Sequence, residues 1–305
     1  VTPTLLGAEV IHAPGALTLG IFADLGWNRR RPVTIRDFNA DGKPDLLFQN
    51  TSGQAFAWFL NGTTLSGGNF VTPGPATADW RIAASGDFTG DAKADLLVQH
   101  QGDGAVRLLR MEGTVGTGEQ LIPIATNTPW RIAGAGDLSN DGHIDIIWQH
   151  VSTRQLYIWF MKPLADWAGF SGPAGAFRGS YLLDTDQAIV TPASTSMRVG
   201  GVADVDLDDR VDLIWQDDTT GALSVWYLNE NTVVSRGPLS HGGVNPVWRL
   251  RVAGDYNDDG HADVVWQHAS SGELYAWFMQ GPSLLTSGPL APSRVNPIWQ
   301  IVGPR

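Results

Sequence analysis

The stretch Asp37-Phe38-Asn39-Ala40-Asp41-Gly42-Lys43-Pro44-Asp45 decides the fold class of this chain, because its pattern recurs four more times. The pattern is Asp-x-(Asp/Asn/Ser/Thr)-x-Asp-x-x-x-Asp, and an apolar run ending in Gln follows it at once. The other copies are Asp87–Asp95, Asp137–Asp145, Asp204–Asp212 and Asp255–Asp263. Oxygen-bearing side chains at alternate positions of a short loop suit a hard cation, which takes carboxylate and carbonyl ligands. The five copies therefore predict five calcium-binding loops.

These loops differ from the EF-hand calcium loop, which closes with a bidentate Glu at its twelfth position. Here the twelfth position is apolar or aromatic, as at Phe48 and Trp148. The closing carboxylate comes at the ninth position instead, as at Asp45, where the apolar strand begins. We expect coordination by the side chains of positions one, three, five and nine, with a backbone carbonyl from position seven.

The composition agrees with a metal-binding chain and excludes several other classes. Of the 31 acidic residues, 16 occupy the coordinating positions, and five bound Ca²⁺ ions would bring the formal net charge from −11 to −1. A chain this acidic is a poor partner for nucleic acid. The sequence contains no Cys, which excludes a disulfide scaffold. No apolar run reaches the length of a membrane span, and no secretory signal opens the sequence.

The acidic loops belong to a longer repeat. Their first Asp residues are spaced by 50, 50, 67 and 51 residues, a period typical of solenoids and propellers. Each unit begins with a Trp-led segment such as Trp80-Arg81-Ile82-Ala83, then has the acidic loop, the strand ending in Gln, and a second strand such as 155–160. Three or four short strands in about 50 residues describe a propeller blade. We predict an all-β propeller of five blades, with six as the alternative, and Trp299–Gly303 as a strand that could complete the ring.

Two segments depart from the repeat. Residues 1–28 contain apolar residues at helical spacing between Ala16 and Trp27, which predicts a short helix and a linker before a propeller at 29–305. The third unit carries 17 extra residues between Phe160 and Arg198. Long loops on a rigid scaffold often bind ligands, although a loop without such a role is the other interpretation.

With these motifs established, the loop and strand units over residues 33–303 resemble the FG-GAP/VCBS repeats of integrin α-subunit propellers and of many secreted bacterial proteins. The resemblance implies a Ca²⁺ site between the first two strands of each blade. The ligands that it implies are Asp37, Asn39, Asp41 and Asp45; Asp87, Thr89, Asp91 and Asp95; Asp137, Ser139, Asp141 and Asp145; Asp204, Asp206, Asp208 and Asp212; and Asp255, Asn257, Asp259 and Asp263.

The sixth loop position is usually Gly in that family, because the turn needs a positive φ. Gly42, Gly142 and Gly260 fit, and Asp209 tolerates such a φ. Ala92 does not fit, so we expect strain in the second loop, whose Thr89 is also a weaker ligand than a carboxylate. We therefore predict that the second site is the weakest and that the fourth, with four carboxylates, is the tightest.

The segment Leu17–Trp27 resembles the last helix of secreted zinc metallopeptidase domains, which often end in Asp-Leu-Gly-Trp before accessory repeats. This resemblance implies that residues 1–28 are the remnant of a preceding protease domain. The chain itself lacks the His-Glu-x-x-His motif, a Gly-x-Ser-x-Gly nucleophile elbow and a phosphate-binding loop. We therefore expect no catalytic residues.

Repeated aromatic and amide side chains are the candidates for ligand binding. One hypothesis is that Trp rings stack on sugars with neighbouring Gln and His as polar partners, and the alternative is that the Trp rings pack between blades. The residues concerned are Trp148, Gln149 and His150; Trp215 and Gln216; and Trp266, Gln267 and His268.

Together these observations favour a secreted, calcium-binding, lectin-like propeller that acts as a non-catalytic module for a glycan or an extracellular protein. Secretion is expected because millimolar Ca²⁺ is found outside cells. The alternatives are a polysaccharide-active enzyme, most plausibly a lyase, and a purely structural accessory domain of a secreted protease. We expect about five Ca²⁺ ions with a structural role, and no nucleic-acid partner.

Overall fold

The computed structural model describes residues 36–75, 77–122, 129–163, 181–189 and 194–303. The chain divides into two compact units, Val1–Val33 and Thr34–Arg305. The first unit lies outside the described residues, and so do the helix expected in residues 1–28 and residues 164–180 of the third unit's insertion. Within the described residues the secondary structure is entirely β, and no described helix could cross a membrane.

The described strands of the second unit pair into five four-stranded antiparallel groups, numbered here in chain order. Group 1 consists of β20 (Trp299–Ile301), β1 (Leu46–Asn50), β2 (Ala55–Asn61) and β3 (Thr64–Phe70). Group 2 consists of β4 (Trp80–Gly86), β5 (Asp95–His100), β6 (Val106–Glu112) and β7 (Val115–Ile122).

The remaining groups follow the same order of strands. Group 3 consists of β8 (Trp130–Gly136), β9 (Asp145–His150), β10 (Leu156–Pro163) and β11 (Tyr181–Ile189). Group 4 consists of β12 (Met197–Ala203), β13 (Asp212–Asp217), β14 (Ala222–Asn229) and β15 (Thr232–Gly243). Group 5 consists of β16 (Trp248–Gly254), β17 (Asp263–His268), β18 (Glu273–Gln280) and β19 (Ser283–Arg294), and one parallel pair, Ala291 with Thr64, joins β19 to β3.

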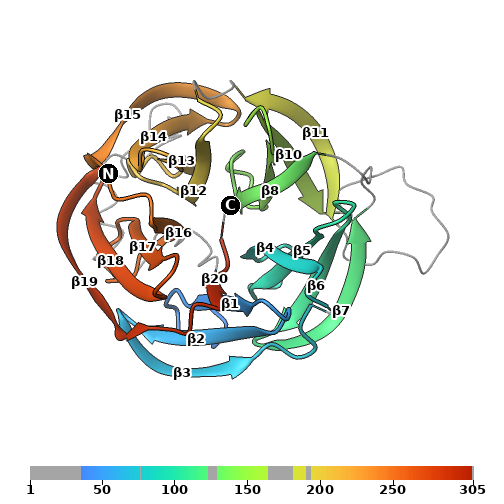
Figure 1. The fold of residues 1–305 in the computed structure, drawn as a ribbon. Helices are drawn as coiled ribbons and strands as arrows, with labels where there is room; N and C mark the ends of the chain where they lie inside the picture. The colour runs from blue at the N-terminus through green and yellow to red at the C-terminus, as the bar shows by residue number, and fades with distance from the viewer. Residues whose placement is uncertain (1–35, 76, 123–128, 164–180, 190–193, 304–305) are drawn as a thin grey trace, which may run out of the picture. The chain divides into compact units, whose positions relative to one another are not determined.

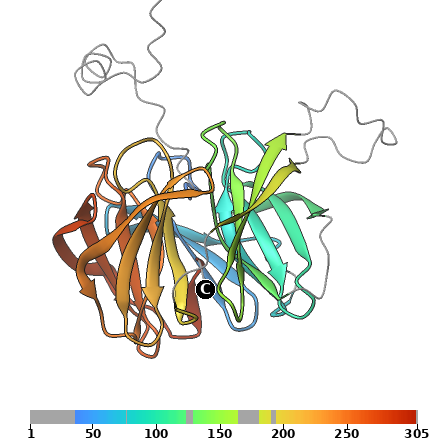
Figure 2. The same ribbon diagram turned by 90° about the horizontal axis from the view of Figure 1, so that it is seen from above.

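The groups are arranged around a common centre within the second unit (Figures 1 and 2). The first strands, β4, β8, β12, β16 and β20, lie nearest the centre, and the last strands lie on the circumference. The second strands are buried along almost their whole length, as in β5, because neighbouring groups cover both of their faces. This double burial explains why the run Leu96-Leu97-Val98 is uniformly apolar instead of alternating.

Group 1 takes its first strand from the far end of the sequence. β20 pairs antiparallel with β1, with Phe48 opposite Ile301 and Asn50 opposite Trp299. The Trp-led segment near residue 299 therefore forms the expected strand, and it completes the group whose other three strands lie at residues 46–70.

The hydrophobic core is divided into clusters that lie between successive groups. Phe88 and Leu97 of group 2 pack in one cluster with Ile146 and Trp148 of group 3. The four other clusters combine groups 1 and 2, 3 and 4, 4 and 5, and 5 and 1 in the same way. The centre is lined instead by small residues of the first strands, so the stability of the unit comes from contacts between neighbouring groups.

Candidate functional site

Each acidic loop leads into the second strand of its group. In groups 2 to 5 the loop also follows the first strand, so it connects the first strand to the second. Loop 1 is Asp37–Asp45, loop 2 Asp87–Asp95, loop 3 Asp137–Asp145, loop 4 Asp204–Asp212 and loop 5 Asp255–Asp263. In loop 1, the backbone amides of Asp41 and Gly42 donate hydrogen bonds to the carboxylate of Asp37, at 3.2 and 2.7 Å. The same two bonds recur in every other loop, at 2.8 to 3.2 Å. The first Asp therefore holds the turn in shape by local hydrogen bonding.

The sixth position has a positive φ in all five loops, as the sequence predicts. Its φ is +82° at Gly42, +88° at Gly142 and +85° at Gly260, and it is +68° at Asp209 and +64° at Ala92. An L-residue in this region costs roughly 1–2 kcal/mol, so loop 2 stores backbone strain at Ala92.

The fourth loop position also has a positive φ, which sequence reasoning missed. The residues there are Ala40, Gly90, Asn140, Leu207 and Asp258, with φ between +56° and +73°. Their side chains share no property, so no residue type marks this position. The loop geometry is therefore imposed by the hydrogen bonds of the first Asp and not by the preference of each residue.

The ninth-position carboxylate is buried in every loop, with at most 1% of the residue exposed. In loop 1, Asp45 accepts hydrogen bonds from the amide of Phe38 at 2.8 Å and from the amide of Leu60 on β2 at 3.0 Å. This carboxylate thereby ties the acidic loop to the third strand of the group. In loop 2, Asp95 accepts the β6 amide of Met111 at 3.0 Å, while the amide of Phe88 donates to Gly86 O instead.

Burial is unfavourable for these carboxylates in their ionised form. It raises the pKa of the ninth-position carboxyl to about 7 in loops 1, 3, 4 and 5, and nearby loop carboxylates add to the effect. Burial likewise raises the pKa of Asp95 in loop 2 to about 6. A cation bound beside these groups would offset the cost of burying them in the charged form.

The donor atoms suit a hard divalent cation. One carboxylate oxygen from each of Asp87, Asp91 and Asp95 lies within 4.8 Å of the other two, and Asp204, Asp206 and Asp208 form a second such cluster. In loop 3, the buried hydroxyl oxygen of Ser139 has no hydrogen-bond partner. An all-oxygen set with an unused buried oxygen fits Ca²⁺ or a similar ion better than a soft metal. The acidic clusters of the loops could therefore hold a metal.

The three Trp and the three Gln residues proposed for ligand binding are all buried. Trp148, Trp215 and Trp266 are 3%, 0% and 2% exposed. The neighbouring residues Gln149, Gln216 and Gln267 are 2%, 0% and 2% exposed. Buried side chains offer no surface to a sugar, so a ligand-binding site has to be formed by other residues. The packing interpretation describes their surroundings, because each Trp lies in a cluster between groups.

The repeated Gln links one group to the next. Gln216 Nε2 donates to Trp248 O at 2.7 Å, and its Oε1 accepts from Leu250 N at 3.1 Å, so both ends of the amide bind β16. Gln49, Gln99 and Gln267 make the same two bonds to the first strand of the following group. Gln149 donates to Met197 O of β12 at 3.4 Å.

The two candidate His residues are partly exposed. The ring of His150 lies edge-on to Trp130 with centroids 5.1 Å apart, and that of His268 lies edge-on to Trp248 at 5.0 Å. The Nδ1 atom of His150 accepts the amides of Ser152 and Thr153, which fixes the turn after β9. These contacts describe His residues that are held in a turn.

An aromatic pocket lies between groups 5 and 1 at the described surface. Its volume is about 350 Å³. The residues that line it are Phe48, Phe56, Trp58, Arg294, Val295, Asn296 and Trp299. A cavity of this size lies within the range of small-ligand sites, and its walls are mostly aromatic. Sequence reasoning missed this pocket because it considered the Trp residues that recur among the repeats and not the positions where one repeat differs from the others.

Two Phe residues of group 1 that line this pocket face each other across neighbouring strands. Phe48 is paired across the strands with Phe56, whereas group 3 has Trp148 opposite Tyr157 at the same positions. Group 5 has Trp266 opposite Tyr275. The pair differs again in the other two groups, with Val98 opposite Arg107 in group 2 and Trp215 opposite Ser224 in group 4, so this position varies from group to group.

Trp58 is also left uncovered on its outer side. Its partner on β3 is Gly68, whereas in group 4 the equivalent Trp226 is paired with Arg236, whose guanidinium lies 4.2 Å from the ring centroid. A side chain at position 68 would collide with Ala57 O and the ring of Phe56, at 2.5 and 2.7 Å from its Cβ. Gly68 therefore leaves Trp58 without a cross-strand side-chain partner on β3.

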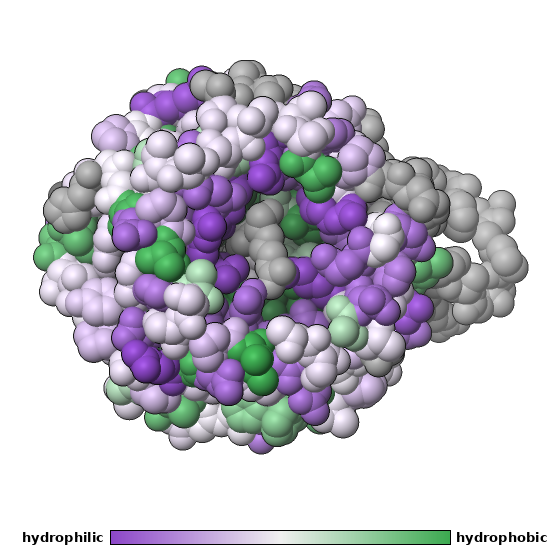
Figure 3. Space-filling model, viewed as in Figure 1, coloured by the Kyte–Doolittle hydropathy of each residue, from purple (hydrophilic) through white to green (hydrophobic). Residues whose placement is uncertain are grey.

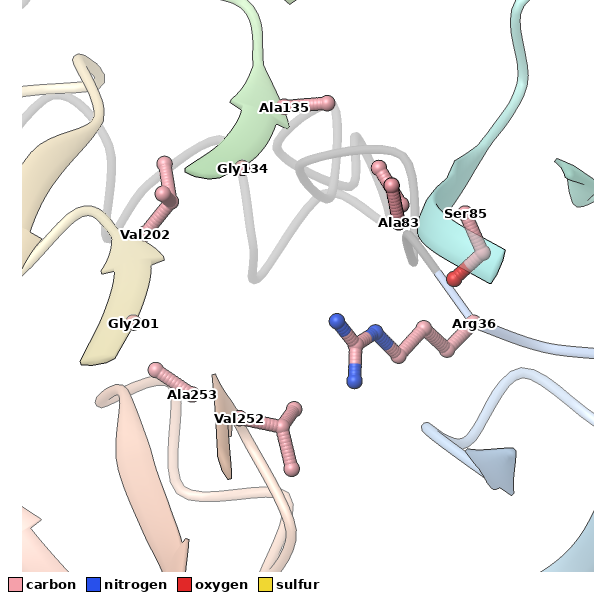
Figure 4. Close-up of a pocket in the computed structure, with 10 residues that line it drawn as sticks. Arg36, Ala83, Ser85, Gly134, Ala135, Gly201, Val202, Val252 and Ala253 are labelled. Carbon is pink, nitrogen blue, oxygen red and sulfur yellow. The ribbon is translucent and has the colours of Figure 1, made fainter. Parts of the chain in front are cut away.

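The central cavity is much smaller. It holds about 20 Å³, and Arg36 points into it beside Ser85 and small residues of β4, β8, β12 and β16 (Figure 4). This volume admits about one water molecule. The cavity therefore has no room for a substrate. The face shown in Figure 3 is largely hydrophilic with scattered apolar side chains, so this face presents no broad hydrophobic docking patch.

Comparison with known proteins agrees with this architecture. Residues 37–98 and 87–148 match a family model described as the FG-GAP-like repeat. No curated protein matches the sequence.

Several solved structures are similar to this chain at low identity. They include a nidogen/laminin complex, with 10% identity, a TM-score of 0.41, and coverage of 82% of this chain and 95% of that chain. A protein of unknown function from Bacteroides caccae has 11% identity, a TM-score of 0.39, and coverage of 81% and 73%. The V. cholerae biofilm matrix protein Bap1 has 14% identity, a TM-score of 0.30, and coverage of 83% and 38%. Residues 37–148 of this chain thus match FG-GAP-like repeats, and four-stranded antiparallel groups recur along the rest of the described residues.

Proposed function

We propose that this protein is a secreted, calcium-stabilised propeller of five blades that acts as a non-catalytic module for binding a glycan. In this proposal the five strand groups are the blades, and the five acidic loops each hold one Ca²⁺ ion. The ligands are the side chains at loop positions one, three, five and nine. The buried ninth-position carboxylates and the all-oxygen donor sets support this assignment.

The magnitude of calcium binding favours a structural role for the metal. A site with a Kd of about 10⁻⁴ M, in millimolar Ca²⁺, stabilises the folded state by about 1.4 kcal/mol. Five such sites would contribute about 7 kcal/mol, which is comparable to the whole stability of an ordinary domain. The ion lies beside a buried carboxylate that joins the loop to the third strand, so calcium would hold each blade together and supply no chemistry to a ligand.

The aromatic pocket is the observation that carries the glycan-binding proposal. Trp58 and Trp299 line a cavity of about 350 Å³, and the polar side chains of Arg294 and Asn296 lie at the same site. Aromatic rings offer flat apolar surface to the C–H faces of a sugar, while amide and guanidinium groups can bond its hydroxyls. Arg294 is paired with Glu273 at 2.6 Å, so the rim has both donors and acceptors and no large excess of charge. A neutral sugar therefore fits this site better than a highly charged one.

A glycan array probed in millimolar Ca²⁺ tests the proposal, with Trp58→Ala and Trp277→Ala as matched variants. Trp277 holds the position of Trp58 in group 5, and the two rings have similar aromatic neighbours, at 4.8 Å from Phe48 and 4.9 Å from Trp266. We expect saturable binding by the wild type and by Trp277→Ala, with a loss of at least about tenfold in affinity in Trp58→Ala.

Equal losses in the two variants would contradict the assignment of the site. The absence of glycan binding by the wild-type protein would refute glycan recognition and leave a protein partner or a structural role. Release of unsaturated sugar ends that absorb ultraviolet light would refute the non-catalytic role.

A further inference from the structure

Arg251 is a buried cation without a partner. It lies in β16 at an irregularity between Leu250 and Val252, where the other first strands have Ala83, Ala133 and Gly200. Only 6% of the residue is exposed. Its Nε atom is buried without a hydrogen-bond partner, and among the described residues no acidic side chain forms an ion pair with it. Burying a charged group in this way is costly unless a counter-charge is present.

Two further arginines lie in the same cluster, and one carboxylate serves both. Arg198 Nε is 2.8 Å from Asp218 Oδ1, and Arg249 Nη1 pairs with the same oxygen. Arg198 is itself only 4% exposed, and its two other nitrogens donate to Leu250 O, at 3.2 Å, and to Gln216 Oε1. The Arg251 cluster, defined as Arg198, Arg249, Arg251 and Asp218, thus contains three guanidinium groups and one carboxylate.

Arg251 is close to the two other arginines along β16, since it lies two residues after Arg249 and directly follows Leu250, whose carbonyl accepts from Arg198. The pKa of Arg251 is lowered to about 9, mainly by burial and also by the charges of Arg198 and Arg249, while Asp218 acts in the opposite direction. Burial also lowers the pKa of Arg198, with Asp218 acting in the opposite direction. This excess of positive charge occurs in a chain whose formal net charge is −11, so it is not part of a generally basic surface.

We propose that the Arg251 cluster binds a small oxyanion, of the class of sulfate, phosphate or a single carboxylate group. The planar guanidinium group pairs with such anions through two parallel hydrogen bonds. The side chains of Arg249 and Asp218 are each 30% exposed, so an ion can approach from their side, while the burial of Arg251 restricts the bound group to a small one.

Sulfate binding to the full chain tests this proposal. Calorimetric titration at fixed ionic strength in millimolar Ca²⁺ compares sodium sulfate with sodium acetate and with a sugar sulfate. We expect saturable sulfate binding by the wild type, weakened at least about tenfold in Arg251→Leu. Binding of the sugar sulfate would assign the anion to the end of a larger ligand, whereas binding of inorganic sulfate alone would assign a free ion.

A matched control separates the cluster from general charge effects. Arg131 is the equivalent of Arg249 in group 3, and it donates to the backbone carbonyls of Trp130 at 2.9 Å and Gln101 at 3.1 Å, so Arg131→Leu should bind sulfate as the wild type does. If Arg251→Leu does not fold, Asp218→Asn serves instead, and it should tighten sulfate binding because it removes the competing carboxylate. Sulfate binding that is absent in the wild type, or equal in the wild type and Arg251→Leu, would overturn the proposal.

Discussion

Replacing Ala92 by Gly should stabilise this protein, although the substitution removes a methyl group. Ala92 lies in loop 2 with φ at +64°, where an L-residue costs roughly 1–2 kcal/mol. Glycine removes this strain, but its greater conformational freedom in the unfolded chain lowers the gain in stability by about 0.4–1 kcal/mol. Ala92 is exposed, so the lost methyl group makes little difference to packing. We therefore expect a net gain of about 0.5–1 kcal/mol, or roughly 1–4 °C in Tm.

Urea unfolding followed by Trp fluorescence measures this difference, with and without a chelator, so that backbone strain is separated from metal affinity. The reciprocal variant Gly260→Ala is the control, because Gly260 holds the same loop position with φ at +85° and a Cβ added there would meet no atom within 4 Å. Only the backbone conformation can therefore penalise it, and it should lose about 1 kcal/mol. A less stable Ala92→Gly variant, or a Gly260→Ala variant as stable as the wild type, would refute the reasoning.

Three further outcomes follow from the same structure. Chelation should lower Tm sharply, since five sites would supply about 7 kcal/mol, and a differential scan that does not change with a chelator would contradict the structural role of calcium. Without metal, the free energy of unfolding should be greatest near pH 4 and fall as pH rises towards 7, because the folded-state pKa of Asp45 and its equivalents is raised to about 7. Urea midpoints at several pH values would show this fall. Midpoints that do not fall would contradict the assignment of raised pKa values to the buried carboxylates. Gln216→Ala should lower the free energy of unfolding by about 1–3 kcal/mol, because it leaves Trp248 O and Leu250 N unpaired. The control Gln101→Ala, at an exposed residue, should have little effect. Equal unfolding midpoints for the two variants would show that the hydrogen bonds of Gln216 to β16 are unimportant for stability.

The sequence by itself determined the acidic loops and the strands that follow them. The reason is that the turn is local: Asp37 binds amides four and five residues later, so the residues that build the loop are neighbours in the chain. The spacing of the copies likewise predicted an all-β repeat, and the position of Ala92 predicted a residue with an unfavourable positive φ. The helix expected within residues 1–28 and the protease resemblance lie outside the described residues and stay predictions.

Only the tertiary structure decided which side chains are buried and which residues meet across the groups. The sequence left both packing and ligand binding open for the repeated Trp and Gln residues, and their burial between groups distinguishes the two. The aromatic pocket joins Phe48 to Trp299, and the Arg251 cluster joins β12 to β16. Such sites arise where one group departs from its neighbours and distant segments are brought together by strand pairing. Local sequence pattern does not encode those contacts, because register and packing between groups set them.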